Sequence, residues 1–199
     1  PDGVERIGYG AYYGCAELTD ITLPAGVESI GRDAFNGCIK LADVALPANR
    51  TEISDYAFYN CDGLTSVTIP GGVAARGVSA FEDCDGLTSV TVSEGVESIG
   101  YGAFHKCDGI TSVTLPVSVT AIGRYAFSSC NRLESVTFAG TEAEWNDVNK
   151  DGYYQPSNSN VTVTLPETSS HRCSGGTLRA PPPGCPVVLG VGHIFVLKG

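Results

Sequence analysis

Eight cysteines and three histidines are the side chains of this 199-residue sequence best suited to nucleophilic or metal chemistry. No two cysteines have the Cys-x-x-Cys spacing of a zinc ribbon. His105, His171 and His193 lie far apart and belong to no metal-binding motif. The sequence also lacks a nucleophile elbow and a phosphate-binding loop. We therefore expect no catalysis, no resident metal and no cofactor.

One stretch has the pattern of the first half of a calcium-binding loop, Asp-x-Asn-x-Asp-Gly at residues 147–152. The twelfth position of such a loop should be a bidentate carboxylate, and here it is Asn158. Pro156 also disfavours the helix that should follow. A plain Asn/Asp/Gly turn is the preferred interpretation, and calcium binding stays an open alternative.

Six of the cysteines recur at intervals of 23 residues and mark an internal repeat. They are Cys15, Cys38, Cys61, Cys84, Cys107 and Cys130. Ala stands four residues before each of them, and an aromatic residue follows that Ala, Tyr12 in the first copy and Phe in the other five. A constant period of this length is typical of a solenoid, in which equal units stack on one another.

Each copy carries one short alternating segment, such as Ser112–Leu115, in which Val and Leu alternate with Ser and Thr. This period of two predicts a strand with one buried face, and equal units place such strands in a parallel sheet. The return segment Ile-Gly-x-x-Ala-Phe-x-x-Cys has apolar spacings that favour a helical or 3₁₀ turn. The predicted fold is an α/β solenoid with parallel strands on one face and helical turns on the other.

These motifs resemble the BspA-type leucine-rich repeat of bacterial surface antigens. The resemblance rests on Leu-x-x-Val-x-Leu-Pro followed by Val-x-x-Ile-Gly-x-x-Ala-Phe-x-x-Cys, and it covers about residues 1–139. It implies a leucine-rich repeat fold and an extracellular or cell-surface location. It also implies adhesion or protein binding, because several proteins of this type bind host proteins.

The repeat divides the chain into a six-copy solenoid at 1–139, a cap at 140–166 and a Pro/Gly-rich, flexible tail at 167–199. In the cap, Thr141 and Glu144 form a capping-box pattern at the start of a short helix. Trp145 is expected to cover the last coil, and residues 160–166 are expected to add one strand. The segment 165–169 approaches the Leu-Pro-x-Thr-Gly wall-sorting signal, but the strand-ending Leu-Pro of the repeat explains it better.

The six repeat cysteines are expected to be buried free thiols, because parallel side chains in adjacent coils have unsuitable geometry for disulfides. Cys173 and Cys185 in the tail could bridge each other. Arg50 and Arg76 stand at positions that are Val and Ile in the other copies. They either extend outward as tolerated flaws or form a basic recognition spot.

The net charge and the hydropathy argue against some classes of partner. The formal net charge is −10, which argues against nucleic acid and anionic membranes as partners. No apolar run reaches the roughly 18–20 residues of a membrane-spanning helix, so membrane insertion is not expected. The chain has no Met and starts within a repeat, so we expect it to be an excerpt of a longer protein.

Two surfaces are candidates for binding. The first is the turn edge, which we define as the residues that flank Ala-Phe in every copy. Its candidate residues are Tyr9, Arg32, Tyr56, Tyr59, Tyr101, Arg124 and Tyr125. The second is the outer face of the sheet, with Thr68, Thr91, Thr114 and Thr137. The Tyr side chains suit recognition because they give contact area at low entropic cost, but they also suit packing at turns.

The sequence therefore predicts a non-catalytic binding or adhesion module that is secreted or on the cell surface. Its partner would be a protein of a host or neighbouring cell, a matrix component or a glycan. The alternative is a passive spacer that displays other domains of a longer protein.

Overall fold

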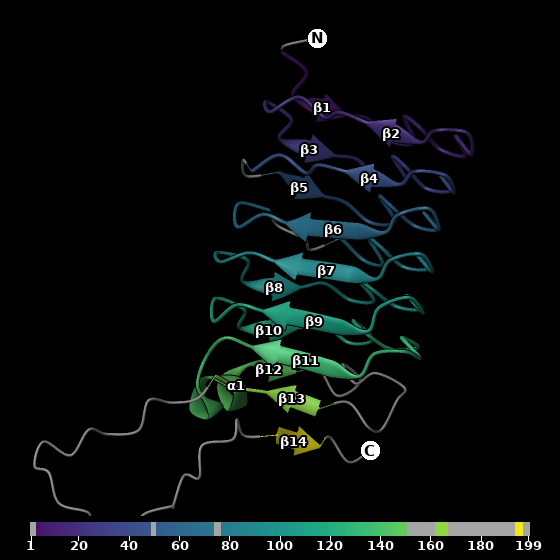
Figure 1. The fold of residues 1–199 in the computed structure, drawn as a ribbon. Coiled ribbons are helices and arrows are strands. Elements are labelled where there is room, and N and C mark those ends of the chain that lie inside the picture. The colour runs from purple at the N-terminus through teal and green to yellow at the C-terminus, as the bar shows by residue number, and fades with distance from the viewer. Residues whose placement is uncertain (1–2, 49–50, 74–76, 151–161, 167–193, 197–199) are drawn as a thin grey trace, which may run out of the picture.

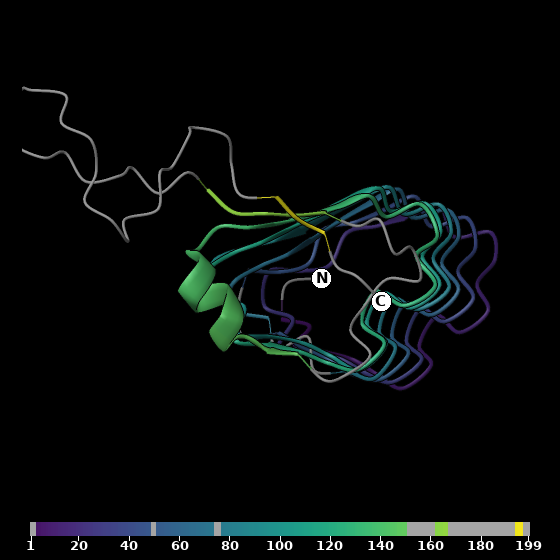
Figure 2. The ribbon, with the colours of Figure 1, turned by 90° about the horizontal axis from the view of Figure 1, so that it is seen from below.

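The computed structural model describes residues 3–48, 51–73, 77–150, 162–166 and 194–196. The chain winds into a stack of similar coils with a short helix near one end of the stack (Figure 1). Seen along the stack, the coils superpose, with the helix on one side and the turns that precede each cysteine on the other (Figure 2). None of the described helices has the length and apolarity needed to cross a membrane.

The predicted parallel sheet is present on one face of the stack. On this face β2 (Asp20–Ile21) and β4 (Asp43–Val44) form a two-stranded sheet. A six-stranded sheet follows, to which β6 (Ser66–Ile69), β7 (Ser89–Val92), β9 (Ser112–Leu115), β11 (Ser135–Phe138) and β13 (Thr162–Thr164) belong. Each residue pairs with its equivalent in the next coil, as Val67 pairs with Val90 and Val90 with Val113. The strand expected within residues 160–166 is β13, which is parallel to β11. The last strand, β14 (Ile194–Val196), pairs antiparallel with β13.

A second row of short strands lies on the opposite side of the coils and was not predicted. It consists of β1 (Arg6–Ile7), β3 (Ser29–Ile30), β5 (Glu52–Ile53), β8 (Ser98–Ile99), β10 (Ala121–Ile122) and β12 (Asn149–Lys150). These strands are also parallel, again with equivalent positions opposite each other, as Ile99 is to Ile122. Each has two residues, so none is long enough to show an alternating pattern in the sequence.

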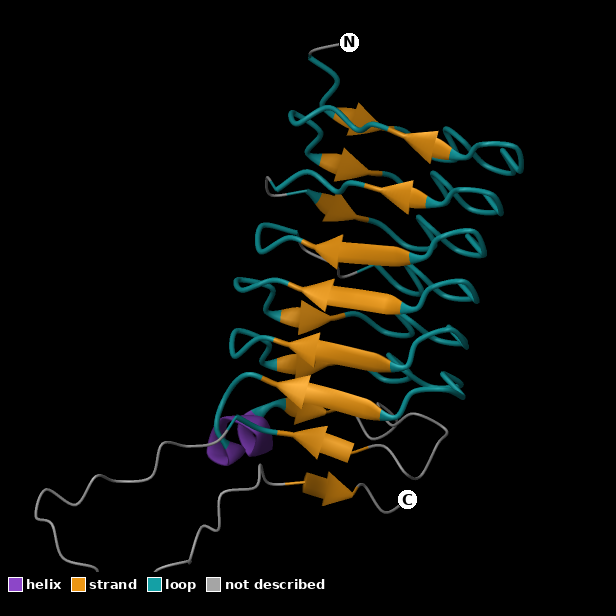
Figure 3. Cartoon of the chain, in the orientation of Figure 1, coloured by secondary structure: helices purple, strands orange, loops and turns teal. Residues whose placement is uncertain are grey.

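The prediction of helical or 3₁₀ segments in the return path was wrong. These segments form hydrogen-bonded turns, and the only helix among the described residues is α1 (Glu142–Asp147) (Figure 3). In every coil, the residues five and one before the cysteine have a left-handed φ of 53° to 76°. A left-handed residue at these two places interrupts the right-handed helical geometry. Amide groups such as that of Phe58 consequently donate to the next coil, here to the Ala80 carbonyl at 2.8 Å.

Aromatic rings form a continuous stack through the core. The rings of Tyr12 and the five Phe residues that follow it at 23-residue intervals lie 5.0 to 5.6 Å apart, with interplanar angles of 2° to 10°. All five Phe rings of this stack are at most 2% exposed. The stack therefore links every coil to both of its neighbours.

The repeat cysteines act as hydrogen-bond donors as well as small core residues. Each of the five buried thiols donates to the carbonyl of the aromatic residue in the preceding coil, as Cys84 Sγ does to the Phe58 oxygen at 3.1 Å. Equivalent bonds of 3.0 to 3.2 Å join the other four buried cysteines to the coil before them. Burial raises the pKa of Cys38 to about 11 and that of Cys130 to about 12. The prediction of buried free thiols is confirmed for these five.

For Cys15 the prediction was wrong, because this free thiol is exposed. Each buried repeat cysteine is covered by the coil on its N-terminal side, and Cys15 belongs to the first described coil. The other apolar residues of that coil, such as Ile7 and Leu18, are likewise only partly buried. Burial of the cysteine column thus depends on a neighbouring coil.

The last coil is covered as expected. Thr141 and Glu144 form a complete capping box at the start of α1, in which the Thr141 amide donates to Glu144 Oε2 at 2.7 Å. These bonds from Thr141 lower the pKa of Glu144. Trp145 is buried, and its ring lies 5.3 Å from that of Phe138. The capping box thus fixes the helix that brings Trp145 onto the last coil.

Several sequence predictions fall on residues that the structure does not describe. Arg50 and Arg76 lie outside the described residues, as do Cys173, Cys185 and the tail positions 167–193. Of the calcium-like pattern, Asp147 ends α1 and Asn149 begins β12, whereas residues 151 and 152 lie outside.

We expect alkylation without denaturant to modify Cys15 rapidly and to leave Cys38, Cys61, Cys84, Cys107 and Cys130 unmodified. Of these six repeat cysteines only Cys15 is accessible, and ionisation of a buried thiol is disfavoured. Peptide mass spectrometry assigns the modified sites, and treatment in guanidinium chloride shows that all the thiols can react. Rapid labelling of Cys61 or Cys84 in the native protein would contradict the buried column.

We expect Phe81→Ala to reduce the free energy of unfolding by about 3–5 kcal/mol, because it removes a ring from the middle of the stack. The ring contacts both Phe58 and Phe104, so two coil interfaces are weakened at once. Denaturant unfolding measures the loss. The matched surface control is Thr91→Ala, which should change stability by less than about 0.5 kcal/mol. A loss below about 1 kcal/mol for Phe81→Ala would contradict the role of the stack.

Candidate functional site

The turn edge is built by an alternation of backbone hydrogen bonds. In the second coil, the amides of Asp33, Phe35 and Gly37 donate to carbonyls of the third coil at 2.8 to 3.1 Å, and those between them donate within the turn. The alanine and the aromatic side chain point into the core, and most side chains on either side of them lie at the surface, whereas Ser79 is buried. The backbone is thus the same in each coil, whereas these outer side chains differ.

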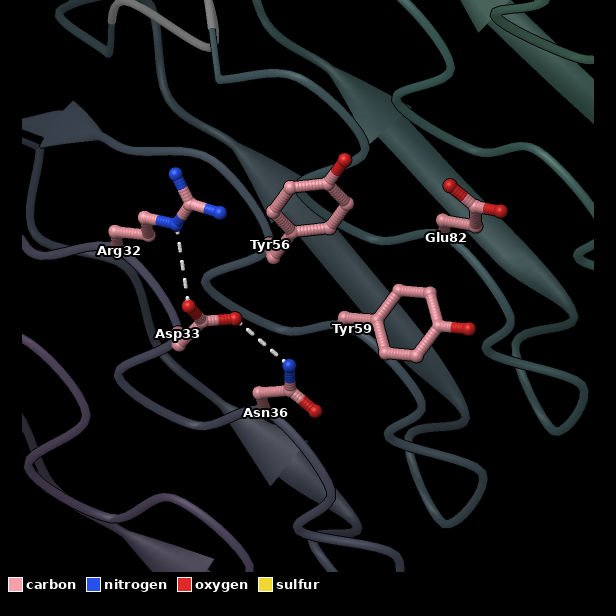
Figure 4. Close-up of a pocket in the computed structure, with 6 residues that line it drawn as sticks. All are labelled: Arg32, Asp33, Asn36, Tyr56, Tyr59 and Glu82. Atoms are coloured by element: carbon pink, nitrogen blue, oxygen red, sulfur yellow. Dashed lines mark hydrogen bonds and ion pairs between the residues drawn. The ribbon is translucent and has the colours of Figure 1, made fainter.

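A hollow on the turn edge lies across the second, third and fourth coils and has a volume of about 400 Å³. We call it the tyrosine hollow. Its lining residues are Arg32, Asp33, Asn36, Tyr56, Tyr59 and Glu82 (Figure 4). Three of them, Arg32, Tyr56 and Tyr59, were predicted as binding residues, and the structure brings these three together.

One side of the tyrosine hollow is organised by Asp33. Its Oδ2 accepts from Arg32 Nε at 3.3 Å and its Oδ1 accepts from Asn36 Nδ2 at 2.8 Å (Figure 4). The Arg32 guanidinium also lies 5.5 Å from the centre of the Tyr56 ring, within cation–π range. Tyr56 in turn packs edge-to-face on Tyr59, with 6.0 Å between the ring centres. These contacts connect the five side chains before any ligand binds.

The other side of the hollow is organised around Glu82. Its Oε1 lies 2.9 Å from His105 Nδ1 and 3.9 Å from Lys106 Nζ. The Tyr59 hydroxyl donates to Asp83 Oδ2 at 3.5 Å, and burial together with this carboxylate raises the pKa of Tyr59. The phenol therefore stays protonated and remains a hydrogen-bond donor at neutral pH.

A second group of predicted residues meets on the fifth and sixth coils. Tyr101 packs edge-to-face on Tyr125 with 5.5 Å between ring centres, and the Arg124 guanidinium lies 4.8 Å from the centre of the Tyr125 ring. His105 lies 6.2 Å from Tyr125 between the rings' centres. The turn edge thus carries two Arg–Tyr–Tyr clusters, with Glu82 and His105 between them.

Two of these tyrosines occupy backbone positions that are unfavourable for them. Tyr56 and Tyr125 have φ of 56° and 62°, at the position where Gly10 and Gly102 stand in the first and fifth coils. A left-handed conformation costs a non-glycine residue about 1–2 kcal/mol. The same position is left-handed in all six coils, with Asp33 and Ser79 in the second and fourth. The turn of the repeat therefore imposes this conformation whatever the role of the two rings.

The remaining predicted residues lie outside the two clusters. Tyr9 is 77% exposed and stands on the first coil, in neither cluster. Thr68, Thr91 and Thr114 are exposed on the outer face of the sheet, and Thr137 is half-buried there. This face is regular and repeats the same small hydroxyl groups.

The sequence interpretation missed Asn36 and Glu82 as lining residues and the pairing of Glu82 with His105. The signal for that pairing was present, because Glu82 and His105 are 23 residues apart and therefore adjacent in the stack. Among the described residues, no group of three or more His, Cys, Asp or Glu side chains is placed to hold a metal ion.

Stacked parallel coils of about 23 residues with a variable edge define a leucine-rich repeat solenoid. Residues 5–134 match the BspA-type leucine-rich repeat region in six copies, and the chain belongs to this family. Comparison with curated protein sequences finds no match.

Among solved structures, the chain is 36% identical to a leucine-rich repeat protein of T. pallidum, with a TM-score of 0.61 over 69% of each chain. A leucine-rich cell surface protein of Faecalibacterium prausnitzii is 24% identical, with a TM-score of 0.50 over 76% of this chain and 56% of that one. The pneumococcal vaccine antigen PcpA is 19% identical, with a TM-score of 0.63 over 78% of this chain and 39% of that one. At these lower identities the last two likenesses show the fold alone.

We expect Tyr56→Asn to change the free energy of unfolding by less than about 1 kcal/mol. Asn adopts the left-handed conformation readily, so the relief of backbone strain offsets the lost ring contacts. The matched control is Tyr59→Asn, at a position without a positive φ, which should destabilise the protein more. Denaturant unfolding of both variants gives the comparison. If Tyr56→Asn were the more destabilising of the two, the Tyr56 ring would be a packing element.

Proposed function

We propose that this chain is a non-catalytic binding module at the cell surface or outside the cell, and that it engages its partner through the turn edge. The observation that carries the proposal is the pair of Arg–Tyr–Tyr clusters, which stand on a rigid stack of coils. Tyr and Arg are enriched among the residues that dominate binding energy in interfaces. The proposed location rests on the BspA-type leucine-rich repeat family to which the chain belongs.

The sheet face supports binding less well. Its Ser and Thr residues repeat from coil to coil. The strands β6, β7 and β9 contribute no aromatic or Arg side chain to this face. Such a surface has the same modest hydrogen-bonding groups in each coil, so it discriminates poorly between partners. The turn edge differs from coil to coil and therefore suits selective recognition.

We expect the double variant Tyr101→Ala/Tyr125→Ala to weaken binding by about 2 kcal/mol or more, as loss of a true anchor does. The matched double variant Thr91→Ala/Thr114→Ala on the sheet face should cost less than about 1 kcal/mol. The measurement is surface plasmon resonance against a panel of purified extracellular-matrix and cell-surface proteins. The opposite ranking would move the site to the sheet face, and absence of any binding would favour the passive spacer.

A further inference from the structure

The unused hydrogen-bonding groups of the tyrosine hollow indicate the chemistry of its ligand. The Arg32 Nη groups, Asn36 Oδ1, the Tyr56 hydroxyl and Glu82 Oε2 have no hydrogen-bond partner among the described residues. They comprise a strong donor, two acceptors and one hydroxyl that can do both. The hollow thus presents donors and acceptors side by side, which is the complement of a ligand with several neighbouring hydroxyl groups.

These groups are held in place before a ligand arrives. Asp33 fixes Arg32 and Asn36 on one side, and its own side chain is only 14% exposed. His105 and Lys106 hold Glu82 on the other side, where its side chain is 15% exposed. Side chains that are already ordered lose little conformational entropy on binding.

The hollow also has an aromatic surface between its polar sides. In Figure 4 the rings of Tyr56 and Tyr59 stand between Arg32, Asp33 and Asn36 on one side and Glu82 on the other. An aromatic face carries a negative quadrupole that attracts weakly positive C–H groups. A pyranose ring combines a face of C–H groups with a rim of hydroxyls, and so fits both parts of the hollow.

Charge argues against the other classes of ligand. An anion near Arg32 would also meet the carboxylates of Asp33 and Glu82, and a cation near Glu82 would meet Arg32 and Lys106. An aliphatic side chain would find no Leu, Ile, Val or Met in the lining. The volume of about 400 Å³ lies near the lower end of the range for small-molecule sites.

We propose that the tyrosine hollow is a saccharide-binding site that takes one or two rings of a neutral glycan. The C–H face of a ring packs on Tyr56 and Tyr59, and its hydroxyls bond to Arg32, Asn36 and Glu82. This inference rests on the proposed function, of which it names the ligand class at one site.

The test uses an array of immobilised neutral oligosaccharides, built from hexoses and N-acetylhexosamines, together with sulfated and sialylated ones. We expect a subset of the neutral glycans to bind the full chain. Tyr56→Asn should weaken that binding at least tenfold and Glu82→Gln at least threefold. Arg32→Met, on an exposed side chain, should also weaken it, and Thr114→Ala on the sheet face should leave it unchanged. Circular dichroism of each variant confirms folding.

Three results would overturn the inference: binding of no glycan, binding of anionic glycans alone, or neutral-glycan binding that Tyr56→Asn does not weaken. A parallel measurement separates this failure from failure of the proposed function. If no glycan binds, while an enzymatically deglycosylated protein partner binds and the Tyr101→Ala/Tyr125→Ala variant loses it, the turn edge binds protein and the saccharide site is wrong. If neither glycan nor protein binds, both proposals fail.

Discussion

Each coil of this solenoid meets the next at its own equivalent position, 23 residues along the chain, and the rest of the structure depends on this register. Three ladders share it: the sheet, the row of short strands opposite, and the turn-edge amides that donate from one coil to the next. The thiol bond of each buried cysteine to the preceding coil adds a fourth link of the same period. A residue inserted into one coil would put all four out of step, which explains why the spacing is constant over the six copies.

The same register divides the residues of a coil into two classes. Inward residues such as Ala80 and Phe81 meet their own equivalents above and below, so their size is confined. Outward residues on the turn edge have no such restriction on size, since the backbone hydrogen bonds there form with any side chain. Tyr56 and Tyr125 show how far this freedom extends, because the hydrogen-bonded frame keeps each in a left-handed conformation. Variation can therefore build a binding surface without disturbing the core.

The core columns could be predicted because residue type itself repeats: Phe58, Phe81 and Phe104 are buried as the sequence indicated. The turn conformation could not be predicted in this way. Its left-handed positions are Gly in some coils and Asp, Asn, Tyr, Ser or Lys in others, so no single residue type marks them. Whether a repeat cysteine such as Cys15 is buried depends on an adjacent coil rather than on the residues next to it in the sequence. The tyrosine hollow could not be predicted either, because Arg32 and Tyr56 meet across coils through rotamers that the sequence does not specify.

The direction of the hydrogen bonds has a mechanical consequence. The bonds between coils run along the stack, so tension between its ends acts directly on the interface of one coil with the next. Because each coil contacts only its neighbours, an outermost coil can detach while the remainder stays folded. One detached coil of 23 residues releases a chain of roughly 80 Å when fully extended. A molecule built in this way lengthens under load in separate steps, and the coils that remain keep their surface intact.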